Sequence, residues 1–485
     1  MKKILLWGLL TAFAAAPAWA QQDGQDTYQD PSMTMGLSAM DSMSVFKLPF
    51  VYTKIGEQQY VGFRIQPEIA IWKIGVGFDV PLLWNVETGE LRKDEFQNGV
   101  GALRMMRYLR YGFKKRDKVY VKIGDMTGEY IGFGGLVNQY TNSPSFEKRA
   151  VGISADIRPV PYFGIEGLYG NLSTSGLLAV RPYVRPLATT EIPVAKTVEI
   201  GFTYLQDRDN TDYTKVFQDD EAVNDPSNLP STYYVRDGLS AWGVDMGVTV
   251  VNNSMLRLTA YTQYNKLNKI DSDSLRARQL ELAIANPEQA DLINGYKAGT
   301  GFSFGVHAGI NFVANIFNLD VRLERLWFSD YYQPQFFNAI YELNKDAKIE
   351  SLLTTTSLTG TFGALTGTII NKVRLGGGLL LPDNVSEQNP AYIYLTLDAN
   401  ELIDGWIIQG SYIKGQLADL SDAFTLDQRS LAQGRLAYRF AKFLALGVDA
   451  KWTFARTVED GVEKFKVQQF IMPYFGLHVP FNLNK

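Results

Sequence analysis

Charged side chains at alternate positions are the feature of this 485-residue chain with the clearest chemical meaning. In 197–206 and 241–251, for example, polar or charged residues alternate with apolar ones. In an extended strand this spacing puts the two kinds of side chain on opposite faces. Because a charge is unfavourable on a lipid-facing wall, we expect the polar face to line a wet interior. The candidates for this lining are Arg181, Arg185, Glu199, Asp245, Arg257, Asp320, Arg322, Glu324, Arg374, Arg435, Arg439, Asp449 and Lys451.

The signs of these charges predict how the interior would treat a solute. Three groups repeat charges along one strand face: Asp320, Arg322 and Glu324; Arg181 and Arg185; Arg435 and Arg439. Arginines that face carboxylates across a lumen would create a transverse field that orients polar solutes. Cations and anions are nearly balanced over the alternating pattern, which predicts weak charge selectivity. The alternative is that these residues pair with one another and fill a closed interior.

Residues suited to catalysis are scarce. The chain has no Cys, which excludes a thiol nucleophile, a disulfide scaffold and a cysteine-based zinc site. Its two histidines, His307 and His478, lie in strand-like segments, and we interpret them as hydrogen-bonding spacers. The glycine-rich run 124–135 lacks the Lys-Ser/Thr of a phosphate loop, and we interpret it as strand glycines beside aromatic residues. We therefore expect a protein that is not an enzyme and that holds no cofactor or metal ion.

Residues 1–20 have the pattern of a secretory signal peptide. Lys2 and Lys3 precede an apolar run, and the small residues around Trp19 fit a cleavage site. The run is too short to anchor the chain in a membrane, and no later apolar run reaches about 18 residues. Residues 21–59 are expected to form a flexible N-terminal extension, because their first half is polar and has no periodicity.

Alternation continues through 60–485 in stretches of about ten residues, the length that a tilted strand needs to cross a bilayer. The connections alternate between short ones, such as 252–254 and 370–372, and long ones, such as 207–239 and 267–298. A soluble antiparallel sheet also alternates, but it has no reason to keep this asymmetry. The predicted fold is all-β: a transmembrane antiparallel β-barrel of about 16–20 strands, with short periplasmic turns and long extracellular loops.

Some segments depart from strand alternation. Arg104, Arg107 and Arg110 are three residues apart, so we expect a helical turn there, because in a strand one arginine would meet lipid. Capping residues and helical spacing indicate loop helices near 275–295 and 334–350. Either one of these loops folds inward and narrows the pore, or both cover the outer rim or a partner.

Two stretches carry a resemblance to a known class. In the first stretch, segment 118–124 alternates and is followed by Gly132-Phe133-Gly134-Gly135. In the second, the expected last strand contains Phe470, Tyr474 and Phe475, and Phe481 lies near its end. With the signal peptide and the loop asymmetry, these stretches resemble bacterial outer-membrane porins. The resemblance implies Sec-type export, an outer-membrane location and recognition of the last strand by the barrel-assembly machinery. The chain departs from the family pattern in the four residues that follow the final Phe.

The expected function is that of a porin-like channel for passive diffusion of small polar solutes. The alternative is a non-conducting outer-membrane barrel whose long loops bind a partner or a surface. The expected partners are outer-membrane lipid and small polar solutes, and assembly into a homo-oligomer stays open. The net charge of −4 argues against a nucleic-acid partner, which would favour a basic chain.

Overall fold

The computed structural model describes most of the chain from residue 44 onward. The described residues are 44–48, 50–55, 58–93, 96, 105–143, 150–173, 176–207, 239–269, 298–313, 316–343, 345–370, 373–400, 403–441, 444–459, 462–477 and 479–481. The predicted signal peptide, most of the N-terminal extension, the loop helix near 275–295 and His478 lie outside them.

The described chain consists almost entirely of β-strands. They are β1 (Ser44–Lys47), β2 (Phe50–Ile55), β3 (Gln58–Ile71), β4 (Ile74–Phe78), β5 (Val80–Asn85), β6 (Met106–Tyr111), β7 (Val119–Gly124), β8 (Gly152–Val160), β9 (Phe163–Tyr169), β10 (Leu178–Val184), β11 (Glu199–Asp207), β12 (Leu239–Asn252), β13 (Leu256–Lys269), β14 (Gly299–Val313), β15 (Phe317–Phe328), β16 (Leu358–Ile369), β17 (Val373–Pro382), β18 (Ala391–Asn400), β19 (Trp406–Leu417), β20 (Ser430–Ala441), β21 (Leu444–Glu459), β22 (Val462–Leu477) and β23 (Val479–Phe481). The helical elements are η3 (Ala195–Thr197), α6 (Lys345–Thr354) and η6 (Leu420–Phe424). Among these described elements, no helix has the length and hydropathy to cross a membrane.

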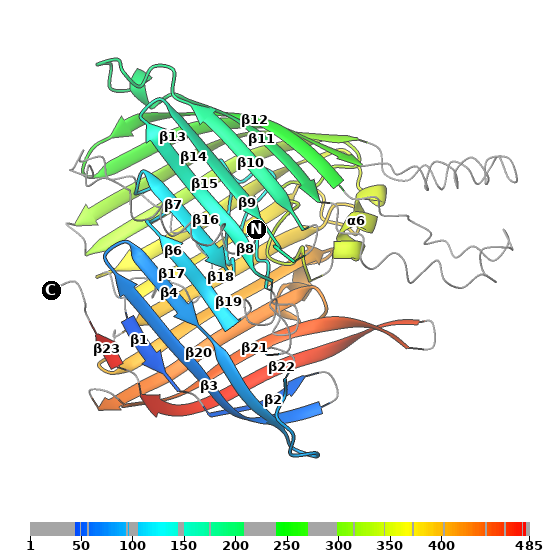
Figure 1. Cartoon of the computed structure of the whole chain (residues 1–485). Coiled ribbons are helices and arrows are strands. Elements are labelled where there is room, and N and C mark those ends of the chain that lie inside the picture. Colours follow the sequence, from blue (N-terminus) through cyan, green and yellow to red (C-terminus); the bar gives the residue numbers. More distant parts are fainter. Residues whose placement is uncertain are drawn as a thin grey trace, which may run out of the picture.

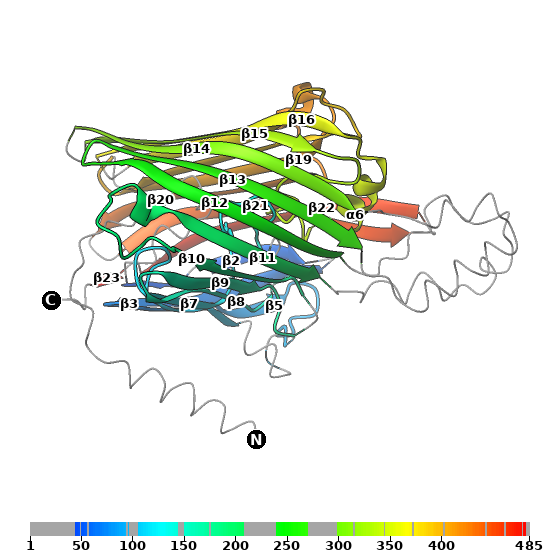
Figure 2. The same ribbon diagram turned by 90° about the horizontal axis from the view of Figure 1, so that it is seen from above.

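The strands form one antiparallel sheet that curls into a nearly closed barrel (Figures 1 and 2). Three pairs of strands, β1 with β2, β4 with β5 and β22 with β23, each follow one line of the wall, so the described chain makes a 20-strand barrel. From β6 to β22 every strand pairs with the next one along the chain. This confirms the predicted fold class and the upper end of the predicted strand range.

The barrel closes where the two ends of the described chain meet. The ladder between β1 and β23 joins Ser44 to Phe481 and Phe46 to Val479. Further along the same line, β2 lies beside β22. The first wall strand therefore begins at Ser44, which corrects the predicted boundary at Tyr60: Val51 and Thr53 are buried, whereas the neighbouring aromatic residues of β2 face outward.

The connections alternate between short turns and long loops. The short connection 253–255 lies at one end of the barrel, and the longer connections 383–390 and 418–429 lie at the other end. Helix α6 lies in one of the long loops, at the rim on the right of Figure 1. It begins at Lys345, later than the helix predicted near 334–350, and residues 334–343 form turns instead.

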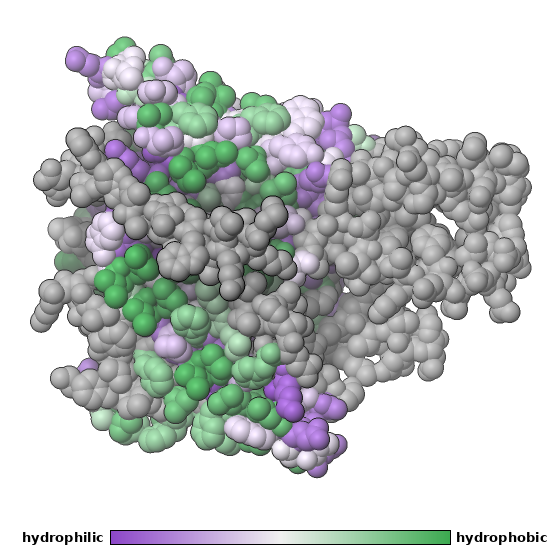
Figure 3. Space-filling view, in the orientation of Figure 1, coloured by the Kyte–Doolittle hydropathy of each residue, from purple (hydrophilic) through white to green (hydrophobic). Residues whose placement is uncertain are grey.

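The wall strands turn large apolar side chains outward. Phe202, Phe304 and Leu323 are about half exposed, whereas their neighbours in sequence are inward-facing and more buried. Figure 3 shows hydrophobic residues gathered over the strand wall on the face in view. An apolar outer face on a barrel with paired backbone groups suits a lipid environment.

Strand β6 overturns the helical turn predicted around Arg107 and Arg110. Met106–Tyr111 is extended and pairs with β4 and β7. A β-bulge opposite Gly77 and Phe78 turns Arg107 toward Glu68, 3.7 Å away, while Arg110 is buried. In a regular strand, one of two arginines at an odd spacing would face lipid. Because a bulge shifts the alternation by one residue, both arginines can avoid lipid.

Candidate functional site

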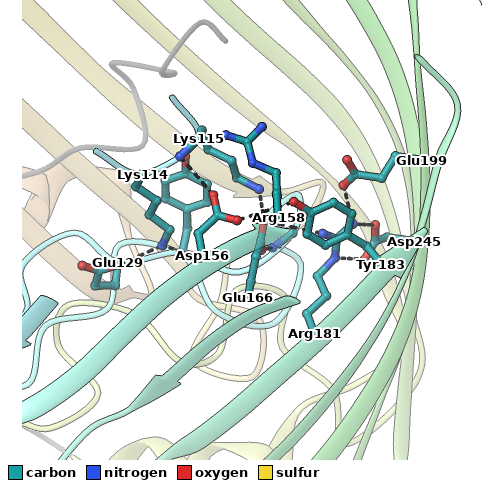
Figure 4. Close-up of polar contacts among 12 residues, drawn as sticks. Lys114, Lys115, Glu129, Asp156, Arg158, Glu166, Arg181, Tyr183, Glu199 and Asp245 are labelled. Carbon is teal, nitrogen blue, oxygen red and sulfur yellow. Dashed lines mark hydrogen bonds and ion pairs between the residues drawn. The ribbon is translucent and has the colours of Figure 1, made fainter. Parts of the chain in front are cut away.

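A charge cluster lies inside the barrel, formed by Glu166, Arg181, Glu199 and Asp245 on β9–β12 (Figure 4) and by Arg185, the residue that follows β10. Arg181 is fully buried, and its Nε and Nη2 donate to the two carboxylate oxygens of Asp245 at 2.8 and 2.5 Å. Its Nη2 also donates to Glu199 at 2.9 Å, and its Nη1 is 3.6 Å from Glu166. Arg185 completes the cluster with two hydrogen bonds to Glu199.

The register of the strands brings these side chains together. Arg181 on β10 lies directly opposite Glu166 on β9, and Gly201 on β11 makes room for the guanidinium. A Cβ at Gly201 would lie 2.4 Å from the Arg181 Nε. Alternation predicted that Arg181, Glu199 and Asp245 face inward, and the cross-strand register decides that they meet.

The turn between β6 and β7 adds two lysines to the cluster (Figure 4). Lys115 makes an ion pair with Glu166, and its backbone N–H donates to Asp156 at 3.0 Å. Lys114 donates to Glu129 and to the carbonyl of Tyr130, both at 2.8 Å. Burial lowers the pKa of Lys115 to about 8. The sequence analysis missed both lysines, because turn residues do not follow the alternation on which it relied.

Residues 125–143, the inward segment, fold from β7 into the barrel interior and reach several wall strands. The Gly132 N–H donates to Glu166 at 2.8 Å, and the Gly135 N–H donates to Gln263 of β13 at 2.9 Å. The Phe133 ring stacks on Tyr261 with 4.7 Å between ring centroids. At the end of the segment, Lys451 of β21 donates to the Ser143 carbonyl at 3.3 Å.

The conformation of the inward segment corrects the interpretation of 124–135 as strand glycines. From Asp125 onward the run leaves the strand and forms an irregular segment with one isolated bridge at Glu129, and Gly132 and Gly134 have φ of +58° and +79°. These values favour glycine, because a Cβ would be strained there. A Cβ at Gly132 would also meet Arg181 at 2.8 Å. The glycines therefore let the backbone approach the charge cluster closely.

A second group of charged residues lies on β13–β15. Arg322 donates to Tyr261 at 2.6 Å and to Glu324 at 2.7 Å, and it also bonds the Phe133 carbonyl of the inward segment. Two residues before Arg322 on the same face of β15, Asp320 is 2.9 Å from the His307 Nε2. The predicted run of charges on β15 therefore faces the interior as partners of neighbouring side chains. His307 has the hydrogen bond expected of a spacer.

The remaining lining candidates lie on other parts of the wall. Arg435 on β20 and Asp449 on β21 form a two-bond ion pair at 2.7 and 2.6 Å. Arg257, Arg374 and Arg439 lie within a few residues of the short turns, away from the charge cluster, and are partly exposed. Most of the candidates thus form local pairs that the structure shows, and these three lie near the short-turn rim.

Residues 329–357, the capping loop, join the inward segment at the long-loop end. Val137 and Phe337 form a parallel bridge, and the Asn138 N–H donates to the Phe337 carbonyl at 3.1 Å. Phe336 and Tyr341 are buried in the same apolar core, which also takes in side chains from the wall. Among the described residues, no group of His, Asp and Glu is arranged to hold a metal ion.

Fold and site together define the class of protein. A barrel of antiparallel strands pairs its backbone groups without water and can face lipid with apolar side chains. This barrel has such an outer face, charged side chains in its interior, and short turns opposite long loops. These are the features of a bacterial outer-membrane β-barrel.

Solved structures of outer-membrane proteins are similar to the chain over most of its length. Wzi of Escherichia coli, described as a carbohydrate-binding β-barrel involved in group 1 capsule assembly, is 10% identical with a TM-score of 0.34, covering 92% of this chain and 86% of Wzi. OprD of Pseudomonas aeruginosa is 9% identical with a TM-score of 0.33, covering 91% of this chain and 94% of OprD. OccD3 (OpdP) of the same organism is 9% identical with a TM-score of 0.32, covering 91% of each chain. No family model and no curated protein matches the chain.

Proposed function

We propose that the chain is an outer-membrane channel through which small polar solutes diffuse passively. The observation that carries the proposal is the charged interior. The charge cluster lies on and beside β9–β12, Arg322 and its partners lie on β13–β15, and the inward segment forms hydrogen bonds with both groups. Ionised groups on an inner wall are favourable where water and polar solutes reach them. The inward segment would narrow the passage between the two groups.

The pairing of charges supports weak charge selectivity as part of this proposal. Arg181 is held by Asp245, and Arg435 by Asp449, so each cation has a carboxylate beside it. A pore whose charges are neutralised locally presents a weaker net field than one lined by rings of a single sign. Five of the thirteen lining candidates named from the sequence are buried, namely Arg181, Asp245, Asp320, Arg322 and Glu324, so we propose that a solute would pass the other eight, which are partly exposed.

Single-channel recording in planar bilayers tests this proposal. Purified, refolded protein is expected to give steady open steps in KCl. A polar solute that enters the pore should reduce the current in a concentration-dependent manner. Correct insertion is checked separately by the β-sheet signal in lipid vesicles. Silent protein that passes this check would overturn the channel proposal.

A second candidate function is a non-conducting barrel whose long loops bind a partner. The observation that favours it is the apolar core shared by the inward segment and the capping loop, in which Val137 and Phe337 are fully buried. Such packing would obstruct the long-loop end if it persists in the membrane. The same recordings separate the two functions, because only the channel predicts open steps.

A further inference from the structure

Residues 418–429, the outer flap, connect β19 to β20 at the long-loop end and contain η6. The flap lies on the outer face of the wall, where the Tyr412 hydroxyl donates to the Ala423 carbonyl at 2.6 Å. Tyr412 lies directly opposite Leu395, which faces outward and is 38% exposed, whereas Ile413 belongs to the apolar core inside the barrel. The flap therefore folds back over side chains that point away from the lumen.

A small apolar core joins the flap to the outside of the barrel. Ala423 packs with Ala391 and Leu417, which lie opposite each other on β18 and β19. This core is separate from the one that the inward segment and the capping loop share. Three partly buried residues pack against it: Leu381, Val385 and Ile393. The flap is therefore packed against the wall instead of extending away from it.

The flap also covers a cation on the outer face. Lys414, two residues after Tyr412 on the same face of β19, has no exposed side-chain surface. Its Nζ donates to Asp427 at 2.9 Å and also to the Thr425 carbonyl. An uncovered lysine on a lipid-facing wall is unfavourable. Because the flap neutralises and covers Lys414, this part of the wall can lie in apolar surroundings.

The height of the flap on the wall corresponds to the outer leaflet of the membrane. Trp406 and Tyr438 form an aromatic pair on the outer face near the short turns, with 5.0 Å between ring centroids. Such rings mark one boundary of the apolar band of a membrane barrel. From Trp406 to Lys414 the tilted strand rises about 20 Å, less than the roughly 25 Å height of such a band. The flap therefore covers the wall within the lipid, on the side of the long loops.

The surface that the flap leaves exposed contains three large apolar side chains, Leu420, Phe424 and Leu426, the flap patch. Phe424 is 71% exposed, the largest fraction among the large apolar residues of the described chain, and the two leucines are 45% and 41% exposed. The Phe424 ring stacks on Tyr412 with 6.0 Å between centroids. The flap patch is therefore continuous with the lipid-facing wall.

The ion pairs of the flap lie nearer the long-loop rim. Arg429 donates to the carbonyl of Gln416 at 3.2 Å, and Gln416 is further along β19 toward the rim than Tyr412. Arg429 also donates to Asp427 at 3.0 Å, and it is 3.8 Å from Asp422, whose side chain is 51% exposed. A segment with aromatic rings on its deeper side and charges on its shallower side matches the polarity of a membrane–water boundary.

We propose that the outer flap is a membrane anchor whose patch, Leu420, Phe424 and Leu426, inserts among the acyl chains of the outer-leaflet lipid. Burying these side chains in hydrocarbon would favour one depth and tilt of the barrel. The occupant is the acyl chain and not a headgroup phosphate, because the charged side chain within η6 is the carboxylate of Asp422. The proposal concerns membrane insertion, so it holds whether or not the barrel conducts.

Site-specific labelling tests the proposal, because the chain has no native Cys. Phe424→Cys is labelled with a fluorophore, and the protein is placed in lipid nanodiscs. Quenching by lipids that carry a nitroxide on the acyl chain is compared with quenching by iodide in the water. Leu375→Cys, on the outer face of β17, is the lipid control. Asp404→Cys, exposed in the turn before β19, is the water control.

We expect the acyl-chain nitroxide to quench the label at 424 at least half as strongly as the label at 375. Iodide should quench it less than the label at 404. Weaker nitroxide quenching overturns the proposal. If iodide then quenches strongly, the flap faces water, and if neither quencher acts, a second protein covers it.

Two unlabelled variants separate lipid contact from the packing of the flap itself. Phe424→Leu loses the ring that stacks on Tyr412 but stays apolar, whereas Phe424→Asn has a side chain of similar size that is polar. In lipid vesicles, the denaturant midpoint of Phe424→Asn should lie about 0.3 M or more below that of Phe424→Leu, because a polar group on a lipid-facing surface is unfavourable. Equal midpoints would show that Phe424 does not meet lipid and would overturn the proposal.

Discussion

Arg181 shows what a single buried cation does in this barrel. It balances Asp245 and Glu199 at hydrogen-bond distance and Glu166 at ion-pair distance, with no exposed surface. Arg181→Met would leave these carboxylates without that cation. We expect a loss of about 3–5 kcal/mol in the free energy of unfolding, because the remaining carboxylates would stay buried without a compensating positive charge. Denaturant titration in detergent measures it.

The control for this variant is Arg325→Met. Arg325 makes a pair of similar length with Asp383, but both side chains are about 40% exposed. Water screens such a pair, so the change in unfolding free energy should be much smaller. Equal losses for the two variants would mean that burial does not set the strength of these interactions.

Lys348 predicts a pH dependence of stability. Its pKa is about 7 in the folded chain and 10.5 in a solvated side chain, and burial is the cause. Below about pH 7 both states are protonated, and the full burial penalty opposes folding. Between about pH 7 and 10.5 the unfolded state holds the extra proton, so stability rises with pH. Denaturant midpoints should rise across this window in the wild type and stay flatter in Lys348→Met; parallel curves would contradict the assignment.

Individual residues also show how far sequence reasoning reaches. Alternation predicts that Arg181, Glu199 and Asp245 lie on the inner face, because side-chain period reports the face of a strand. It could not pair them, because the partner of a residue depends on the register between strands far apart in sequence. The sequence did not indicate that Lys114 and Lys115 face the interior, because a turn has no side-chain periodicity.

The inward segment is the element that we expect to affect permeation most. Its backbone bonds to Glu166 and Gln263, and its carbonyl at Phe133 accepts from Arg322, so it occupies space between wall strands. Replacing 129–140 by two glycines should raise single-channel conductance by about twofold or more, because a constriction of the lumen is removed. Phe304→Ala, on the outer face, is the control and should leave conductance unchanged.

This deletion also distinguishes a constriction from a structural strut. If the segment only braces the wall, the shortened protein would be less stable but would conduct like the wild type. Unchanged conductance in a correctly inserted variant would therefore refute its role in the passage.

Elements differ in how much of them the sequence predicts. The long strands such as β14 and β21 were clear, since alternation persists over ten or more positions. Strand β6 was misread as helical, because a bulge changes which face Arg107 occupies, and spacing alone does not reveal a bulge. The glycine run was misread because glycine suits both a crowded strand and a tight turn.

The whole barrel should discriminate weakly between cations and anions. Its interior charges occur as local pairs, such as Arg185 with Glu199 and Arg435 with Asp449. We expect a reversal potential close to zero in a KCl gradient, since paired charges contribute little net field. Arg435→Gln should shift it toward cation preference by releasing Asp449. A strong preference in the wild type would show that unpaired charges dominate the pore.

The junction of the two chain ends governs how the barrel can be made. Val479–Phe481 of β23 pair with Ser44–Phe46 of β1, near the start of the described residues. Every other neighbour in the wall is already present before those last residues are synthesised. The cylinder consequently cannot be completed until translation and export have delivered residues 479–481. A chain cut short before Val479 would retain an open strand edge and would be a substrate for aggregation or proteolysis instead of a finished barrel.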